Sequence, residues 1–216
     1  MERSKAYIRE LLTGLVPDPE QIIWKCDIYV RELLKWNVRI NLTAIIDPAE
    51  CWEKHIQDSL LPLQYIMQES SLLDMGSGAG LPAIPLKLCC PDMEVTSVDK
   101  VRKKINFQKH CKRLLDLQGF NAITARLDAH LEMERRFAVV TARAMAPLAE
   151  LIAFGSPHVK SGGLLLAMKG RVGHEEMEGG HSAAAAANME VERIEECYLK
   201  PSGAQRQLIF MRKKEV

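Results

Sequence analysis

A glycine-rich stretch of the chain has the residues needed to bind a ligand through its main chain. Its three glycines stand at alternate positions, Gly76, Gly78 and Gly80. An apolar run ending in Asp74 precedes them and an apolar segment containing Pro82 follows, which predicts a buried strand, a tight turn and a helix start. Glycine accepts positive φ, and a helix start offers unpaired N–H groups. The stretch therefore predicts a site for a nucleotide-like ligand.

The glycine spacing separates two classes of ligand. A dinucleotide fingerprint requires GxGxxG or GxGxxA, whereas here the third glycine comes one residue early and Leu81 takes the sixth position. Asp99 ends the second predicted strand, where an acid can hold ribose hydroxyls of a nicotinamide cofactor or of S-adenosylmethionine. Asp74 favours S-adenosylmethionine, because a carboxylate would repel a pyrophosphate but could hold the methionine ammonium directly or through water. A turn that binds nothing is the remaining alternative.

Two residues at the end of the third predicted strand could complete such a site. In a doubly wound sheet the ligand crevice lies beyond the carboxyl ends of the strands. Asp128 could accept a hydrogen bond from an adenine amino group there, while Leu127 offers a backbone donor and an apolar wall. A helix N-cap at Asp128 explains that residue about as well, so both interpretations stay open.

Arg143 follows the fourth predicted strand, where a seven-stranded methyltransferase brings the acceptor to the methyl group. An amino-group methyltransferase would be expected to show an Asn/Asp-Pro-Pro-aromatic motif at this place, and this chain has none. A cytosine-C5 enzyme needs a cysteine nucleophile, usually after proline, and the sequence has no Pro-Cys dipeptide. These observations favour an acceptor that is already nucleophilic. We therefore name no catalytic residue and assign Arg143 to cofactor or phosphate positioning.

A run of seven cations contains no acidic residue. Its members are Lys100, Arg102, Lys103, Lys104, Lys109, Lys112 and Arg113. Such a run is about as often a solvated helix face as a surface for a phosphate backbone, and both interpretations stay open. Three further basic segments, Lys169, Arg171 and Arg212–Lys214, could extend it.

His55 and Asp58 lie three residues apart on one predicted helix face. An acid–base or metal pair is conceivable, but we expect a satisfied structural pair. The segment from His174 to His181 resembles a metal motif only superficially, because it lacks histidines four residues apart. We predict no metal site.

The elements that would hold these residues fall into two parts. Residues 1–68 are predicted to form a helical extension, with helix starts at Asp18-Pro19 and Asp47-Pro48. The first of these helices is expected to fade near Trp36-Asn37. Residues 69–216 alternate between strands and helices, which predicts parallel βαβ units with right-handed crossovers.

The second part is predicted to be an α/β domain with a seven-stranded, mostly parallel sheet and helices on both faces. The predicted parallel strands are Leu72–Met75, Val95–Val98, Ala122–Ala125, Ala138–Thr141 and Leu164–Met168. The predicted helices between them are Pro82–Cys90, Arg102–Leu117 and Leu148–Lys160. An antiparallel hairpin, Val191–Leu199 with Gln207–Met211, closes the sheet. The alanine run Ala183–Ala187 fits either a helix or a linker.

Charge, cysteine content and apolar runs indicate where the protein is located and which partners it can have. The formal net charge of +1 gives no argument for or against nucleic acid, so only local clustering can. The six cysteines form no CxxC pair and no signal peptide precedes them, which predicts reduced thiols in the cytoplasm. No apolar run approaches the ~20 residues that cross a bilayer. We expect a cytoplasmic monomer without a membrane partner.

Taken together, these residues resemble one enzyme family. The matching segments are Lys35–Asn37 with Asn41–Thr43, His55 with Asp58–Leu60, Asp74–Pro82, Arg143–Ala144 and Lys169–Gly170. They resemble the bacterial small-subunit rRNA guanine-N7 methyltransferases, methyltransferase G, also named glucose-inhibited division protein B. Departures from the family pattern are mild: Asp128 stands where Glu is common, Ala79 where Pro is common, and Ala83 where Gly is common.

The resemblance implies a Rossmann-like class I fold that uses S-adenosylmethionine to methylate N7 of a guanine in small-subunit (16S) rRNA or in a ribosomal particle. It also implies the cofactor contacts Gly76, Leu81, Leu127, Asp128 and Arg143. The residue analysis adds Gly78 and Asp99. Three other functions stay open: methylation of another RNA, a non-catalytic RNA- or ribosome-binding module, and a nicotinamide-dependent oxidoreductase, which the glycine spacing and Asp74 disfavour.

Overall fold

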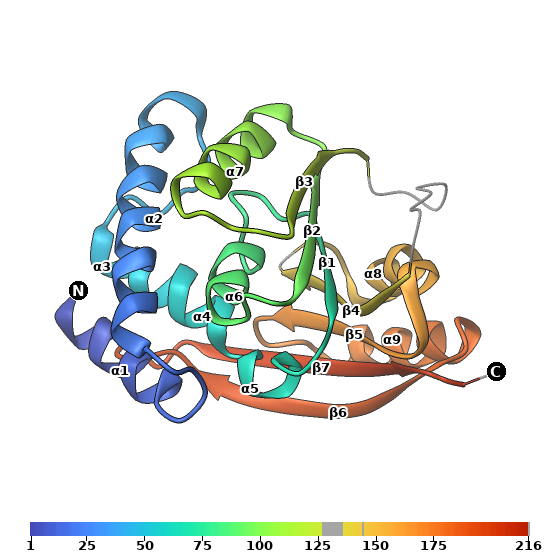
Figure 1. Ribbon diagram of the computed structural model, residues 1–216. Coiled ribbons are helices and arrows are strands. Elements are labelled where there is room, and N and C mark those ends of the chain that lie inside the picture. Colours follow the sequence, from blue (N-terminus) through green and yellow to red (C-terminus); the bar gives the residue numbers. More distant parts are fainter. Residues whose placement is uncertain (127–135, 144, 216) are drawn as a thin grey trace.

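A seven-stranded sheet forms the centre of the computed structural model, which describes residues 1–126, 136–143 and 145–215 (Figure 1). The strands are β1 (Ser71–Met75), β2 (Glu94–Asp99), β3 (Phe120–Thr124), β4 (Phe137–Arg143), β5 (Val159–Lys169), β6 (Met189–Tyr198) and β7 (Gln205–Lys213). In the described residues their order is β3-β2-β1-β4-β5-β7-β6. Strands β1 to β5 pair in parallel, and β7 pairs antiparallel with β5 and β6. The predicted α/β fold with a closing hairpin is confirmed.

The two strands next to the site are neighbours at the centre of the sheet. β1 pairs with β2 on one side and with β4 on the other, so the strand order changes direction between β1 and β4. Open α/β sheets bind ligands beyond the carboxyl ends of their strands at such a switch point. Because Met75 is in register with Ala142, the glycine loop after β1 and Arg143 at the end of β4 leave the sheet side by side.

Successive residues of the central strands point to opposite faces, and each face has its own core. Leu72 belongs to a buried cluster with side chains of the N-terminal helices, of α6 (Ala83–Cys89) and of α7 (Arg102–Leu114). Leu73 belongs to a second cluster with side chains of α8 (Leu148–Gly155) and α9 (His174–Ala186). Helices therefore cover both faces of the sheet, as predicted (Figure 1).

Helices make up most of the chain before β1. They are α1 (Glu2–Leu12), α2 (Pro19–Ile40), α3 (Pro48–Cys51), the π-helix η1 (Trp52–Gln57), α4 (Asp58–Leu60) and α5 (Leu63–Ile66). Both predicted helix starts are confirmed, because Asp18 accepts from Gln21 N–H and Asp47 from Glu50 N–H, each at 2.9 Å. These caps satisfy N–H groups that have no partner inside the helix. No helix in the described residues is long and apolar enough to span a membrane.

The prediction that the first long helix fades near Trp36-Asn37 is wrong. α2 continues to Ile40 and ends at Asn41, where φ is 48°. The Trp36 ring packs edge-on against Phe107 of α7, with centroids 5.6 Å apart. Contacts from a distant helix therefore hold this turn in place, although its local propensity for helix is weak.

The helix predicted over Leu148–Lys160 is shorter than expected. α8 ends at Gly155 and is followed by the 3₁₀ turn η2 (Ser156–His158). β5 then begins at Val159, which pairs with Phe137 of β4. Val159 is extended because it pairs with a neighbouring strand. The local sequence does not reveal that pairing.

The segment that fits either a helix or a linker is the helix α9. Its Gly180 lies so close to Leu148 of α8 that an added Cβ would overlap that side chain. Ala184, one turn further on, is buried in the second cluster. The small residues of α9 therefore allow it to pack closely on α8.

Candidate functional site

Each glycine of the loop after β1 has positive φ: 65° at Gly76, 57° at Gly78 and 91° at Gly80. A Cβ at Gly80 would also lie 2.6 Å from Ile84 Cδ1, so this position excludes a side chain. The N–H groups of Gly80 and Leu81 both donate to the Ser77 carbonyl, at 2.8 and 3.0 Å. The predicted tight turn is confirmed.

Asp99 and Gln108 hold Gly78 from two sides. The Gly78 N–H donates to Asp99 Oδ2 at 2.9 Å, while the other carboxylate oxygen accepts from Val101 N–H at 2.8 Å. Gln108 of α7 is fully buried, and its Nε2 donates to the Gly78 carbonyl at 2.9 Å and to Ser77 Oγ at 2.8 Å. The loop is therefore held by side chains from two other elements.

Sequence reasoning did not identify Gln108 as part of the site. Its Oε1 also accepts from Ser97 Oγ of β2, so the whole amide group is hydrogen-bonded. A single glutamine on an amphipathic helix belongs to no motif. One signal in the sequence could have identified it: Gln108 lies with Phe107 and Cys111 on the apolar face of the helix. A polar group on that face needs buried hydrogen-bond partners.

Asp74 supports the shape of the loop from inside the protein. Its carboxylate is fully buried and accepts from Ala83 N–H and Thr141 Oγ1, both at 3.3 Å. Burial raises the pKa of Asp74 to about 7, although these two hydrogen bonds and the Arg143 charge oppose the rise. This carboxylate is enclosed and lines neither cavity beside the loop, which disfavours a direct contact with a methionine ammonium. The alternative, a contact through water, stays a prediction.

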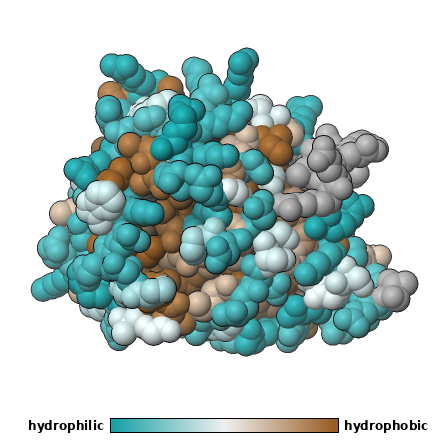
Figure 2. Space-filling model, viewed as in Figure 1, coloured by the Kyte–Doolittle hydropathy of each residue, from teal (hydrophilic) through white to brown (hydrophobic). Residues whose placement is uncertain are grey.

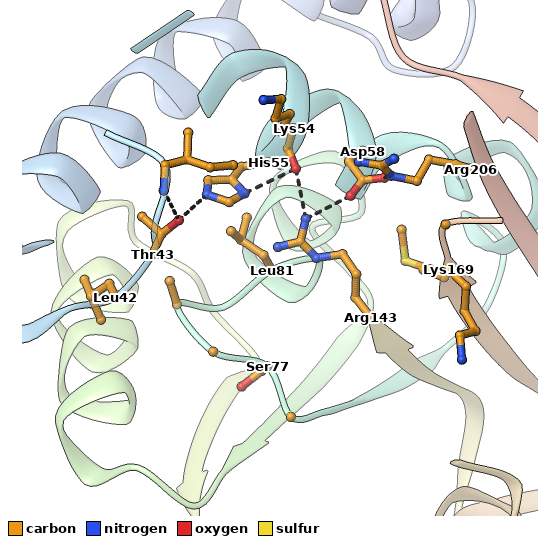
Figure 3. A pocket seen from close by; sticks show the side chains of 16 residues that line it. Leu42, Thr43, Lys54, His55, Asp58, Ser77, Leu81, Arg143, Lys169 and Arg206 are labelled. Atoms are coloured by element: carbon orange, nitrogen blue, oxygen red, sulfur yellow. Dashed lines mark hydrogen bonds and ion pairs between the residues drawn. The ribbon is translucent and has the colours of Figure 1, made fainter. Parts of the chain in front are cut away.

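Two cavities flank the glycine loop and share Gly76. The first, which we name the arginine cavity, has a volume of about 390 Å³ and lies between the loop and the N-terminal helices (Figure 3). Its polar lining comprises Thr43, Lys54, His55, Asp58, Ser77, Arg143, Lys169 and Arg206. The second, the aspartate cavity, has a volume of about 320 Å³ and is lined by Gly76, Asp99, Lys100, Val101, Lys104, Met145, Ala146, Glu150 and Phe154.

The structure brings most of the predicted cofactor residues to this edge of the sheet. Those lining the arginine cavity are Gly76, Gly78, Leu81 and Arg143. Asp99 lines the aspartate cavity on the other side of the loop. The remaining two, Leu127 and Asp128, lie outside the described residues.

Arg143 reaches from the end of β4 to the N-terminal helices. Its Nη1 donates to the Lys54 carbonyl at 3.1 Å and to Asp58 Oδ2 at 3.0 Å. Asp58 Oδ1 accepts from Arg206 Nε of β7 at 2.9 Å (Figure 3). The carboxylate of Asp58 therefore lies between two guanidinium groups. Arg206 was missed in the sequence, because it is separated by 148 residues from Asp58 and belongs to no local pattern.

Comparison with known proteins places this site in a family. Residues 22–209 match the model of a family described as rRNA small subunit methyltransferase G. A protein of that name from Syntrophotalea carbinolica is 41% identical over 214 residues, which cover 96% of this chain and 97% of the relative. One from Geobacter sulfurreducens is 39% identical over 88% of each chain. The chain belongs to the rRNA small subunit methyltransferase G family. The predicted family is confirmed, and with it an rRNA methyltransferase that uses S-adenosylmethionine.

Solved structures agree with this fold. A ribosomal protein L11 methylase from Lactobacillus delbrueckii subsp. bulgaricus superposes with a TM-score of 0.59 at 17% identity, covering 74% of this chain and 79% of the other. At that identity the likeness shows the fold alone. It agrees with the strand order described above and with the predicted class I methyltransferase architecture.

Two of the segments named in the sequence analysis, Lys35–Asn37 and Asn41–Thr43, build one wall of the arginine cavity. The Asn37 side chain accepts from Leu42 N–H and Thr43 N–H and donates to the Thr43 carbonyl. Thr43 Oγ1 in turn accepts from Ile45 N–H and lies 2.8 Å from His55 Nε2. Asn37 of the segment Lys35–Asn37 therefore holds the turn Asn41–Thr43, and the hydroxyl group of Thr43 positions His55.

His55 is hydrogen-bonded through both ring nitrogens. Burial, assisted by the nearby Arg143 charge, lowers the pKa of His55 to about 4. Its Nε2 faces the Thr43 hydroxyl, and its Nδ1 lies 3.2 Å from the Lys54 carbonyl. Asp58 has the two arginines as partners instead. The expected pair of His55 with Asp58 is therefore wrong: both side chains are hydrogen-bonded, but each has its own partners.

The basic run follows helix α7, where hydrophilic residues cover the surface (Figure 2). Five of the seven cations are exposed, and none has an acidic partner among the described residues. The extension to Lys169, Arg171 and Arg212–Lys214 stays a prediction. Lys169 is paired with Glu176 and Arg212 with Glu192, the second pair at 2.9 Å, so the charge of these two residues is partly neutralised.

Proposed function

We propose that this chain transfers the methyl group of S-adenosylmethionine to N7 of a guanine in small-subunit (16S) ribosomal RNA. Family membership supports the methyl transfer and the class of RNA. The choice of N7 rests on the arginine cavity. His55 lines it and would be the candidate general base, but both of its ring nitrogens are hydrogen-bonded and its pKa lies near 4. An acceptor with an available lone pair, such as N7, needs no base.

We assign the two cavities to two parts of the reaction. Asp99 would hold the ribose hydroxyls in the aspartate cavity, while Leu127 and Asp128 would hold the adenine. The backbone of Gly76, Gly78 and Leu81 would support the methionine end at the boundary between the cavities. Gly76 supports this arrangement because it lines both.

The chain's contribution to the chemistry would be alignment and exclusion of water. The sulfonium methyl moves in line to N7, and proximity with orientation can supply several kcal/mol of such a barrier. Positive charge develops on the purine as the methyl arrives. Asp58 supports this assignment because it neutralises part of the guanidinium charge at Arg143, which lies 3.0 Å away and would otherwise oppose the reaction.

The α7 cations are the proposed contact for the RNA backbone. Lys100 and Lys104 line the aspartate cavity, so the basic run begins beside the proposed cofactor site. Among the described residues none of these seven cations has an acidic partner, although His110 of α7 pairs with Glu32. Lys54 of the N-terminal helices, by contrast, pairs with Glu50 at 3.0 Å. A run of cations without acidic partners favours a polyanion as partner. The solvated-face interpretation predicts no effect of neutralising these cations on RNA affinity.

Domain boundaries, location and assembly complete the proposal. We propose that residues 1–68 form a helical extension and residues 69–216 the methyltransferase domain. We also propose a cytoplasmic monomer that acts on ribosomal RNA or on a ribosomal particle. The thiol composition noted above supports the cytoplasmic location.

A labelled-methyl assay tests the function. The full chain is incubated with methyl-labelled S-adenosylmethionine and unmethylated 16S RNA, or with small-subunit particles that lack the modification. Borohydride reduction and aniline cleavage then locate any N7-methylguanine. Label at a single guanine is the expected result. Absence of label from both substrates, with retained RNA binding, would indicate a non-catalytic binding module, and label elsewhere would indicate a different acceptor atom.

A further inference from the structure

We propose that Asp58 and Arg206 are positioning residues that set the orientation and the net charge of Arg143 in the arginine cavity. This inference rests on the proposed function, because it assigns Arg143 a bound anion. Three elements that are far apart in the sequence meet here: α4 supplies Asp58, β4 supplies Arg143 and β7 supplies Arg206. Both arginines line the cavity (Figure 3).

The geometry gives each carboxylate oxygen its own guanidinium. Asp58 Oδ2 accepts from Arg143 Nη1 at 3.0 Å, and Asp58 Oδ1 accepts from Arg206 Nε at 2.9 Å. The Asp58 side chain is 7% exposed, against 18% for Arg143 and 23% for Arg206. The acid is therefore enclosed while both bases keep a surface toward the cavity. Charge-assisted hydrogen bonds of this kind are the strong ones in proteins.

Neighbouring contacts hold Arg206 in place independently of Asp58. The turn between β6 and β7 is tied to the π-helix η1, because Lys200 N–H donates to Gln57 Oε1 and Ser202 N–H to Glu53 Oε1, both at 3.1 Å. Arg206 Nη1 also donates to the Gln205 carbonyl at 2.9 Å. The hairpin is therefore docked on the helix that precedes Asp58. The backbone that carries Arg206 is held in place, and its side chain reaches the Asp58 carboxylate from there.

The charges explain why a second arginine is needed. One carboxylate and two guanidinium groups give this cluster of three side chains a net charge of +1. Without Arg206, Asp58 and Arg143 would form a neutral pair, and the free oxygen of Asp58 would be open to a second donor of Arg143 in a bidentate pair. Arg206 thus occupies that oxygen and leaves part of Arg143 for an anion.

Two anions could occupy this position in the proposed reaction. One is the carboxylate of the methionine moiety, and the other is a phosphate of the RNA acceptor. Both would be recognised by the same guanidinium surface, so the ligands used in the experiment must separate them. S-adenosylhomocysteine carries the carboxylate, whereas 5′-methylthioadenosine keeps the adenosine and lacks it.

A double-mutant cycle tests the inference in the full chain. Affinity for S-adenosylhomocysteine is measured by calorimetry in the wild type, Arg206→Met, Arg143→Met and the double variant. If Arg206 acts through Arg143, Arg206→Met weakens binding about fivefold alone and by less than about twofold when Arg143 is already replaced. Affinity for 5′-methylthioadenosine stays unchanged throughout if the anion is the carboxylate. If it is an RNA phosphate, the same non-additive pattern appears instead in the KM for 16S RNA.

Controls separate positioning from a loss of folding. Arg206→Lys keeps the charge and one donor, so it should recover part of the lost affinity. Arg212→Met removes another ion-paired arginine of β7, bound to Glu192, and should leave the affinities for S-adenosylhomocysteine and 5′-methylthioadenosine unchanged. Thermal unfolding confirms that each variant is folded. The inference would be overturned if the losses of Arg206→Met and Arg143→Met were additive in the double variant. It would also be overturned if Arg206→Met neither weakened S-adenosylhomocysteine binding nor raised the KM for RNA. A wild-type chain without affinity for S-adenosylhomocysteine would instead contradict the proposed function.

Discussion

The glycine loop and the arginine cavity lie side by side but are built over very different distances in the chain. The loop residue Gly78 is held by Asp99 and Gln108, which are 21 and 30 residues away. The carboxylate at the wall of the arginine cavity is held by Arg143 and Arg206, which are 85 and 148 residues away. The first region uses backbone conformation and contacts from the next strand and helix, whereas the second requires an N-terminal helix and the last strand of the sheet to meet at the end of β4.

This difference predicts how each region responds to substitution. A change in the loop alters the backbone directly and should affect cofactor binding strongly. A change in the arginine cavity removes one side chain from a cluster whose other members stay in place, so its effect should be smaller and coupled to its partners. The following predictions test that contrast.

The largest effect is expected from Gly80→Ala. The φ of 91° is unfavourable for any side chain, and the new Cβ would lie 2.6 Å from Ile84 Cδ1. We expect a loss of about 2 kcal/mol in the free energy of unfolding and at least a tenfold loss of affinity for S-adenosylhomocysteine. Urea unfolding and calorimetry measure the two quantities. Gly179→Ala, in the exposed part of α9 with no atom near the new Cβ, is the control and should not weaken binding.

Gln108→Met is expected to have the next largest effect. It removes the donors to Gly78 and Ser77 while keeping the volume, which leaves buried polar groups without partners. We expect a loss of about 1–3 kcal/mol in the free energy of unfolding and several-fold weaker cofactor binding. Lys87→Met removes a comparable polar contact to the Pro91 and Met93 carbonyls at the other end of α6. Equal losses of cofactor affinity in both variants would show that Gln108 has no specific role in the loop.

Asp74 beside the glycine loop and His55 in the arginine cavity should make the free energy of unfolding depend on pH with opposite signs. Asp74 has a pKa near 7 in the folded chain against 3.8 in the unfolded chain, so the folded state holds more protons between these values. Its contribution to the free energy of unfolding therefore falls as the pH rises from about 4 to about 7. His55 has a folded pKa near 4 against 6.5, so its contribution rises from about pH 4 to about pH 6.5.

Unfolding of Asp74→Asn and His55→Gln across this range tests those signs. The difference in free energy between wild type and Asp74→Asn should fall with pH by at least about 1 kcal/mol, and the difference for His55→Gln should rise. Differences are needed because the two contributions partly cancel in the wild type. A flat difference for either variant would contradict the protonation state assigned to that residue.

The smallest effect is expected on helix α7. Replacing Lys109 and Arg113 together by Gln removes two exposed cations that lie away from both cavities. We expect a KM for 16S RNA a few-fold higher and a weaker dependence of that KM on salt. Affinity for S-adenosylhomocysteine should not change. Arg31→Gln, which removes a cation paired with Asp27 on α2, is the matched control. An unchanged KM would favour the solvated-face interpretation of the basic run.

Much of the fold could be predicted because its signals are local. The caps Asp18 and Asp47, the alternation of strands and helices, and the glycine loop all depend on residues within one turn or one βαβ unit. The end of α2 could not be predicted, because Trp36 is held by Phe107 of another helix. The start of β5 could not be predicted either, since Val159 is extended through its pairing with Phe137.

The candidate site divides in the same way. The sequence by itself determined the loop conformation, the acid at the end of β2 and the arginine at the end of β4, because strand ends and glycines set backbone geometry locally. Only the tertiary structure decided that Asp74 faces inward, that Gln108 holds the loop, and that Arg206 shares Asp58 with Arg143. Hydrogen bonds and ion pairs of that kind form between elements that only the packing of the sheet and its helices brings together.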